Sequence, residues 1–157
     1  MAASERARVM MRCAVAAALG LAACAGEIIP RDGAWVHDPG AVEDDTCSQF
    51  FEVPSDPYGD FSITNTGDGA FRIDAGSAEP FSCTLLGDGA FECPSRFENE
   101  ETLTQYNVTI SFNVDVEGTF SSATEGAGEQ HVTVNCEGLL CPAPSCSYVV
   151  PFTISAL

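Results

Sequence analysis

Basic residues are scarce in this chain, which has six arginines, no lysine and two histidines against 23 acidic residues. The formal net charge is −17 at pH 7. Nucleic acids and anionic lipid surfaces are also negatively charged, so this composition argues against both as partners. The acidic residues are most simply read as a solvated surface, with a site for cations or a basic partner as the less expected alternative.

Catalytic groups are also sparse. The histidines are His37, in a segment rich in acids, glycine and proline, and His131, on the polar face of an expected strand. No Gly-x-Ser-x-Gly motif is present. Asp115 and Glu117 would share one strand face with Cβ atoms about 6–7 Å apart, which makes them the first place to look for paired carboxylates. The alternating pattern around them explains both as solvated groups, so we expect no enzymatic activity and no catalytic residues.

The N-terminus has the pattern of an export signal. Arg6, Arg8 and Arg12 precede an apolar run from Cys13 to Ala25. Its 13 residues are too few to span a bilayer, which takes about 20, but they suit the apolar region of a signal peptide.

The end of this run, Leu21-Ala22-Ala23-Cys24, resembles the lipobox of bacterial lipoprotein precursors. The resemblance implies that Cys24 receives a thioether-linked diacylglycerol, becomes the first residue of the mature protein and is then N-acylated with a fatty acid such as palmitate. In that family an Asp after the cysteine retains the protein at the inner membrane, so Ala25 implies the outer membrane. The alternative is ordinary signal cleavage near Ala23 or Ala25, which would leave a soluble secreted protein.

Removing the signal peptide, residues 1–23, leaves 134 residues, enough for one domain. Residues 24–46 are expected to form the lipidated cysteine and an acidic tether, and residues 47–157 an all-β, cysteine-rich domain. Six cysteines remain in that domain: Cys47, Cys83, Cys93, Cys136, Cys141 and Cys146. An even number in an exported chain predicts disulfides.

A repeat predicts one of these disulfides. The sequence Gly-Asp-Gly-Ala-Phe occurs at 67–71 and again at 87–91, and each copy is typical of a β-hairpin with a Gly-Asp-Gly loop. The resulting register places Ile63 opposite Ile73 in the first hairpin and Cys83 opposite Cys93 in the second. We therefore predict a Cys83–Cys93 disulfide.

The other four cysteines are not assigned by geometry. Our working hypothesis pairs Cys47 with Cys136 and Cys141 with Cys146. A zinc site could be drawn from Cys136, Cys141, Cys146 and His131, but the strand pattern puts His131 and Cys136 on opposite faces.

Calcium at the acidic turns is the other metal hypothesis, because Asn65, Asp68 and Asp88 lie among glycines. Neither turn has oxygen ligands at alternate positions or a distal glutamate, so we expect ordinary hairpin turns there. We therefore expect no metal and no cofactor.

Alternation of apolar and polar residues predicts the remaining strands. It is clearest over residues 105–117, with a bulge or turn at Gly118, and it continues over 118–123 and 130–136. Residues 95–101 are expected to form an acidic connector and residues 125–129 a flexible link. A last strand covers residues 148–154, where Pro151 indicates an edge position.

Outside the signal peptide no segment has a helical period. The sequence thus predicts an all-β fold of about eight short strands, a single antiparallel β-sandwich or small β-barrel built from hairpins and stapled by disulfides.

Gly33-Ala34-Trp35 resembles the Gly-x-Trp motif that opens the calycin β-barrels, which include the lipocalins. That resemblance implies a barrel enclosing a small apolar ligand. The chain departs from the family pattern because it has no basic residue after Arg96 to pack over the tryptophan. Trp35 is otherwise expected to be a core residue.

From these features we expect a membrane-anchored exported lipoprotein of the outer membrane, attached through its lipid and serving as a non-enzymatic binding or structural component of the cell envelope. Its partner would be an envelope protein or a small apolar ligand. The alternative is a calycin-like barrel that binds a small apolar ligand.

Overall fold

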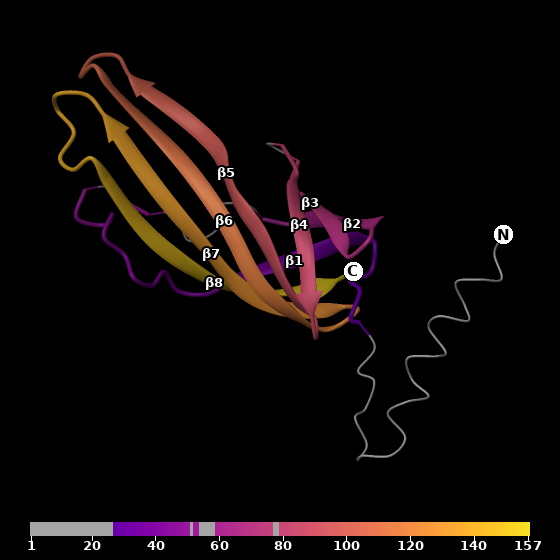
Figure 1. Ribbon diagram of the computed structural model, residues 1–157. Helices are drawn as coiled ribbons and strands as arrows, with labels where there is room; N and C mark the ends of the chain where they lie inside the picture. Colours follow the sequence, from indigo (N-terminus) through magenta and orange to yellow (C-terminus); the bar gives the residue numbers. More distant parts are fainter. Residues whose placement is uncertain (1–26, 51, 54–58, 77–78) are drawn as a thin grey trace, which may run out of the picture.

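The chain forms a single antiparallel β-sheet that closes into a ring (Figure 1). The computed structural model describes residues 27–50, 52–53, 59–76 and 79–157. Each strand pairs with the next in the chain, and β8 pairs with β1. The strands are β1 (Gly33–Pro39), β2 (Phe61–Gly67), β3 (Ala70–Asp74), β4 (Phe81–Gly87), β5 (Ala90–Leu103), β6 (Val108–Ser122), β7 (Glu125–Glu137) and β8 (Ser145–Ala156). The expected all-β antiparallel fold is confirmed, in its ring-closed form.

The ring is uneven, because β1–β4 have 5–7 residues whereas β5–β8 have 12–15. At about 3.3 Å per residue, β6 is about 50 Å long, roughly twice the length of any strand in the first half. The four long strands therefore extend beyond the closed part as a curved sheet (Figure 1). We call the end at the β5–β6 turn and the β7–β8 loop the distal end.

The repeated hairpins have the predicted register. Ile63 lies opposite Ile73, and a disulfide joins Cys83 to Cys93 with Cα atoms 4.1 Å apart. Both predictions are confirmed. The loop itself is shorter than expected: in the first copy Asp68 and Gly69 both have positive φ, as a two-residue hairpin turn requires, and a bulge precedes Gly67.

The pairing hypothesis for the other four cysteines was wrong. The structure joins Cys47 to Cys146 and Cys136 to Cys141. The loop after β7 folds back on itself, so Cys141 returns to the end of β7, where the N–H of Cys136 donates to Pro144 at 3.0 Å. Cys146 already belongs to β8, where the carbonyl of the next residue, Ser147, accepts a hydrogen bond from the N–H of Thr46, so Cys146 lies beside Cys47.

Two segments expected to be irregular are strands. Residues 95–101 lie in β5, where they pair with β6 alone. The pairing shifts register twice in this part of the strand, so polar side chains are tolerated on both faces. Residues 125–129 belong to β7, and Gly118 lies inside β6. In contrast, residues 104–107 form the β5–β6 turn, although the alternation continued through them.

The glycines of β6 and β7 leave space for the side chains that pack against the sheet. A Cβ on Gly128 would lie 2.2 Å from the carbonyl oxygen of Glu117 and 2.7 Å from the Phe152 ring. A Cβ on Gly118 would lie 2.7 Å from the Phe91 ring. The glycine-rich stretch that suggested flexibility therefore leaves room for large side chains against the sheet.

Pro151 does not mark an edge strand, because β8 pairs with β7 on one side and β1 on the other. Pro151 has no N–H to donate. It lies between the last residue pair with β1, Pro39 with Phe152, and the isolated bridge of Glu43 with Val149. The N–H of Gly40 donates to the Pro151 carbonyl at 2.6 Å. The proline is tolerated because it lies where the ladder is interrupted.

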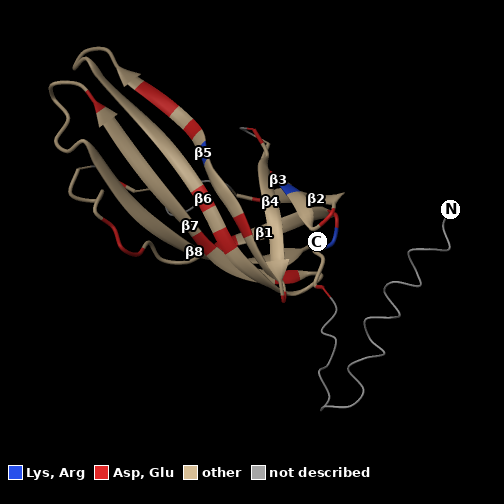
Figure 2. Cartoon of the chain, viewed as in Figure 1, with Lys and Arg blue, Asp and Glu red and all other residues tan. Residues whose placement is uncertain are grey.

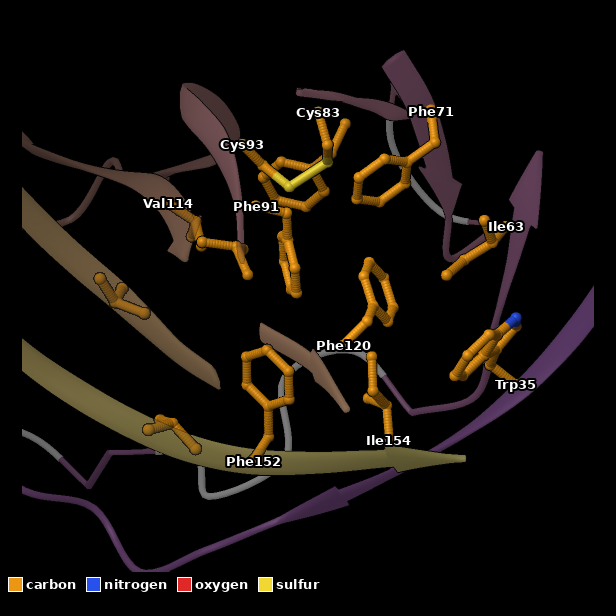
Figure 3. Close-up of a cluster of buried hydrophobic side chains, with 14 of the residues drawn as sticks. Trp35, Ile63, Phe71, Cys83, Phe91, Cys93, Val114, Phe120, Phe152 and Ile154 are labelled. Carbon is orange, nitrogen blue, oxygen red and sulfur yellow. A yellow bond between two sulfur atoms is a disulfide. The ribbon is translucent and has the colours of Figure 1, made fainter. Parts of the chain in front are cut away.

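Aromatic side chains fill the closed part of the ring (Figure 3). Phe120 lies at the centre, with its ring centroid 4.7 Å from that of Phe91, 5.6 Å from Phe71 and 5.8 Å from Trp35. Trp35 is fully buried, as expected of a core residue, and its indole N–H donates to the Arg31 carbonyl at 3.0 Å.

The folded domain begins before Cys47, so the expected boundary between the tether and the domain lay too late in the chain. Strand β1 lies within residues 24–46 and completes the ring, and His37 is buried inside it. Ahead of β1, Ile28 packs against the core and Pro30 is buried. The signal peptide and Cys24 lie outside the described residues. Among the described residues, no helix is long and apolar enough to cross a membrane.

Gln130 supports one test of the core. It is buried beside a cavity of about 30 Å³, and its Oε1 has no hydrogen-bond partner among the described residues. An unsatisfied buried polar atom costs about 1–3 kcal/mol. Gln130→Met should therefore raise the free energy of unfolding by about 1 kcal/mol in denaturant titrations. A fall would indicate that an ordered water in the cavity bonds this oxygen.

Candidate functional site

The acidic residues singled out in the sequence lie on the outer face of the sheet. Asp115 and Glu117 lie on the outer face of β6, opposite His131 and Glu129 of β7 respectively. Glu117 is exposed and Asp115 is partly exposed. This is the solvent-facing position that the alternating pattern predicted.

The zinc site drawn from the sequence is not formed in the described part of the chain. Cys136, Cys141 and Cys146 are all in disulfides, so they offer no thiolates. His131 lies on the outer face of the sheet, as its place in the alternation predicted.

An apolar pocket of about 310 Å³ lies at the distal end. Its floor is the inner face of the long strands, and its walls come from the β5–β6 turn, the β7–β8 loop and the segment after Cys47. We call it the distal pocket. The residues that line it are Phe50, Leu103, Tyr106, Val108, Ile110, Val134, Cys136, Leu140, Pro142, Ala143, Ser145 and Cys146.

Two disulfides hold the walls of the distal pocket. Cys136–Cys141 closes the β7–β8 loop, and Cys47–Cys146 fixes the segment that contains Phe50 to β8. The cystine sulfurs restrict the backbone on both sides, and Pro142 restricts the loop further. The pocket is therefore largely formed before any ligand arrives, as most small-molecule sites are.

The turn that presents Phe50 is held by Asp45. Its carboxylate accepts hydrogen bonds from the N–H groups of Cys47 at 2.7 Å and Ser48 at 2.9 Å. Desolvation acts to raise the pKa of Asp45, but these hydrogen bonds outweigh it and hold the pKa below its usual value. Burial, and then the negative charge of Asp45, raise the pKa of Tyr148 in β8. Both groups keep their ordinary charge at neutral pH.

The rim of the distal pocket exposes large apolar side chains. Leu139 is 97% exposed, Leu140 64% and Tyr106 52%. Single exposed apolar residues are ordinary, but several beside a pocket are typical of a binding surface. Sequence reasoning missed these residues. The available signal was the apolar pair Leu139-Leu140 inside an otherwise polar and proline-rich loop.

The distal pocket lies at the opposite end of the molecule from the start of the described chain. Near that start, the N–H of Arg31 donates to Ala123 at the β6–β7 turn, and the Arg31 guanidinium donates to the carbonyl of Leu157. The pocket lies at the other end of β6, beside Val108. The whole length of the long strands separates the two ends (Figure 1).

Comparisons with protein-family models, with curated proteins and with solved structures gave no significant match.

Proposed function

We propose that this chain is an exported lipoprotein, anchored in the outer membrane through Cys24, and that it is a non-enzymatic binding component of the cell envelope. The distal pocket would receive an apolar side chain of a partner protein in the envelope. The observation that carries the proposal is an apolar pocket of about 310 Å³ at the end farthest from the N-terminal side. That arrangement suits a protein held at one end and working at the other.

Three features support parts of this proposal. The lipobox-like Leu21–Cys24 accounts for the anchor. The three disulfides suit an oxidising compartment. The exposed Leu139 and Leu140 extend the apolar surface beyond the pocket, and this favours a protein surface over a ligand that is fully enclosed.

The alternative is calycin-like binding of a small apolar ligand. The order of strands around the ring suits it, since each strand pairs with its neighbour in the chain. The interior favours it less, because the cavity beside Gln130 measures about 30 Å³, whereas ligand sites measure about 300 Å³ or more. A small apolar ligand would therefore also fit best in the distal pocket.

The anchor is tested by intact mass of the protein from the membrane fraction, with and without reduction. The proposal requires a chain that starts at Cys24, carries added acyl mass and has six fewer hydrogens than the reduced form. An unacylated chain that begins elsewhere would remove the anchor from the proposal and favour a secreted protein.

The distal pocket is tested with an apolar fluorescent probe, N-phenyl-1-naphthylamine. Leu140→Ser should weaken probe binding about 10-fold, because it removes one to two kcal/mol of apolar contact. Ala143→Trp should abolish binding by filling the pocket. Leu86→Ser is the matched control, since Leu86 is 59% exposed on β4 and lies outside the distal pocket. An equal loss of probe binding in the Leu86 and Leu140 variants would contradict a specific site.

A further inference from the structure

A second cluster lies on the outer face of the sheet, away from the distal pocket. Glu117 of β6 is directly opposite Glu129 of β7, and His131 follows two residues later on the same face of β7. One carboxylate oxygen of each glutamate and a ring nitrogen of His131 all lie within 4.8 Å of one another. The strand register therefore brings three potential metal ligands together from two adjacent strands.

The two distances from His131 are close to those between ligands of a shared metal ion. The Nε2 atom of His131 is 3.6 Å from Oε1 of Glu117 and 3.6 Å from Oε2 of Glu129. These separations are too long for good hydrogen bonds. Ligands that bind zinc tetrahedrally at about 2.0–2.2 Å are separated by about 3.4 Å, so the His131 distances need to change little, and the two carboxylate oxygens start within 4.8 Å of each other.

The arginines of the described chain do not neutralise the negative charge around this cluster. Glu92 of β5 lies opposite Glu117, so three acidic positions form a row across β5, β6 and β7, where Figure 2 shows red segments on adjacent strands. Like charges directly opposite each other destabilise a sheet. The Arg31 guanidinium is hydrogen-bonded to the carbonyl of Leu157, Arg96 forms a salt bridge with Glu98, and Arg72 lies on β3. A bound cation would relieve this repulsion.

We propose that Glu117, Glu129 and His131 form a surface site for a divalent transition metal of the zinc class. One imidazole nitrogen and two carboxylate oxygens suit zinc, whereas calcium and magnesium prefer oxygen ligands alone. Three protein ligands leave a fourth position for water or for a group from outside. The site is independent of the lipid anchor and of the distal pocket.

Zinc binding by the full-length, disulfide-bonded protein, prepared without a histidine tag, tests the site. Equilibrium dialysis with metal analysis should give one Zn²⁺ per chain, and Zn²⁺ should raise the melting temperature in a concentration-dependent way. His131→Gln and Glu129→Gln should each weaken Zn²⁺ binding at least about 10-fold. Because these side chains are on the surface, the variants should have the wild-type melting temperature without metal or a higher one.

Two controls make the result specific. Glu100→Gln removes an exposed carboxylate of β5 near the distal end and should leave Zn²⁺ binding unchanged. The other histidine, His37, is buried inside the ring, so loss of binding in His131→Gln identifies the nitrogen ligand. The proposal is overturned if His131→Gln binds Zn²⁺ as the wild type does, or if the Glu100 variant loses binding equally, since either result means diffuse attraction to acidic groups.

Discussion

Replacing Cys47 and Cys146 together by alanine should lower the free energy of unfolding by about 4–5 kcal/mol. The two cysteines are 99 residues apart in the sequence, so their disulfide removes far more freedom from the unfolded chain than a short loop does. Cys47 is also fully buried in the core. The loss should be measured by denaturant titration, with the other two disulfides verified by peptide mapping.

The matched control is the double replacement of Cys136 and Cys141, which are only five residues apart. The same chain-entropy argument gives about 2 kcal/mol for this loop. The two variants remove the same number of sulfur atoms, but they differ in loop length and in burial, because Cys47 is fully buried whereas Cys136 and Cys141 are partly exposed. If both cost the same, the stabilisation would come from native contacts of the cystines and would not depend on the unfolded chain.

Trp35→Ala should cost about 3–5 kcal/mol, the usual loss when a buried tryptophan is truncated to alanine. Trp35 is fully buried, its indole N–H donates to the Arg31 carbonyl, and its ring packs against Phe61 and Phe120. The truncation removes the contacts that β1 makes with β2 through Phe61 and with β6 through Phe120. Circular dichroism should follow unfolding, because this residue is the chain's single tryptophan.

Trp35→Phe is the second variant, since the alanine variant approaches the total stability of many domains of this size. The phenyl ring keeps most of the apolar contact but leaves the Arg31 carbonyl without the indole donor. A loss clearly smaller than that of alanine is expected. Equal losses would mean that the hydrogen bond dominates and that packing contributes little.

Local patterns were enough to predict the hairpins of this fold. A repeated Asp-Gly turn and its flanking residues set the register that pairs Ile63 with Ile73 and brings Cys83 to Cys93. Both effects act within about 12 residues, so no knowledge of the rest of the chain was needed. The alternation of residues 108–117 is likewise a local property of a strand with one buried face.

Local sequence patterns did not predict which distant segments pair in the fold. The partner of Cys47 depends on how the segment after β1 runs along β8, which no local pattern specifies. Gly126 and Gly128 suggested a flexible link because their packing role becomes visible only once Phe120 and Phe152 are placed against them. The distal pocket was missed for the same reason, since its walls come from three distant segments.

The early packing of Ile28 and Pro30 governs how an anchored molecule would stand on its membrane. Only three peptide bonds separate Cys24 from Glu27, a reach of about 10 Å at full extension. A lipid at Cys24 would therefore keep Glu27, and with it the closed part of the ring, within about 10 Å of the bilayer surface. The roughly 50 Å length of β6 would then set the greatest height at which the distal pocket can stand above the membrane. A partner that is itself fixed in the envelope would have to present its apolar group within that height, so distance from the membrane would limit the choice of partners in addition to the chemistry of the pocket.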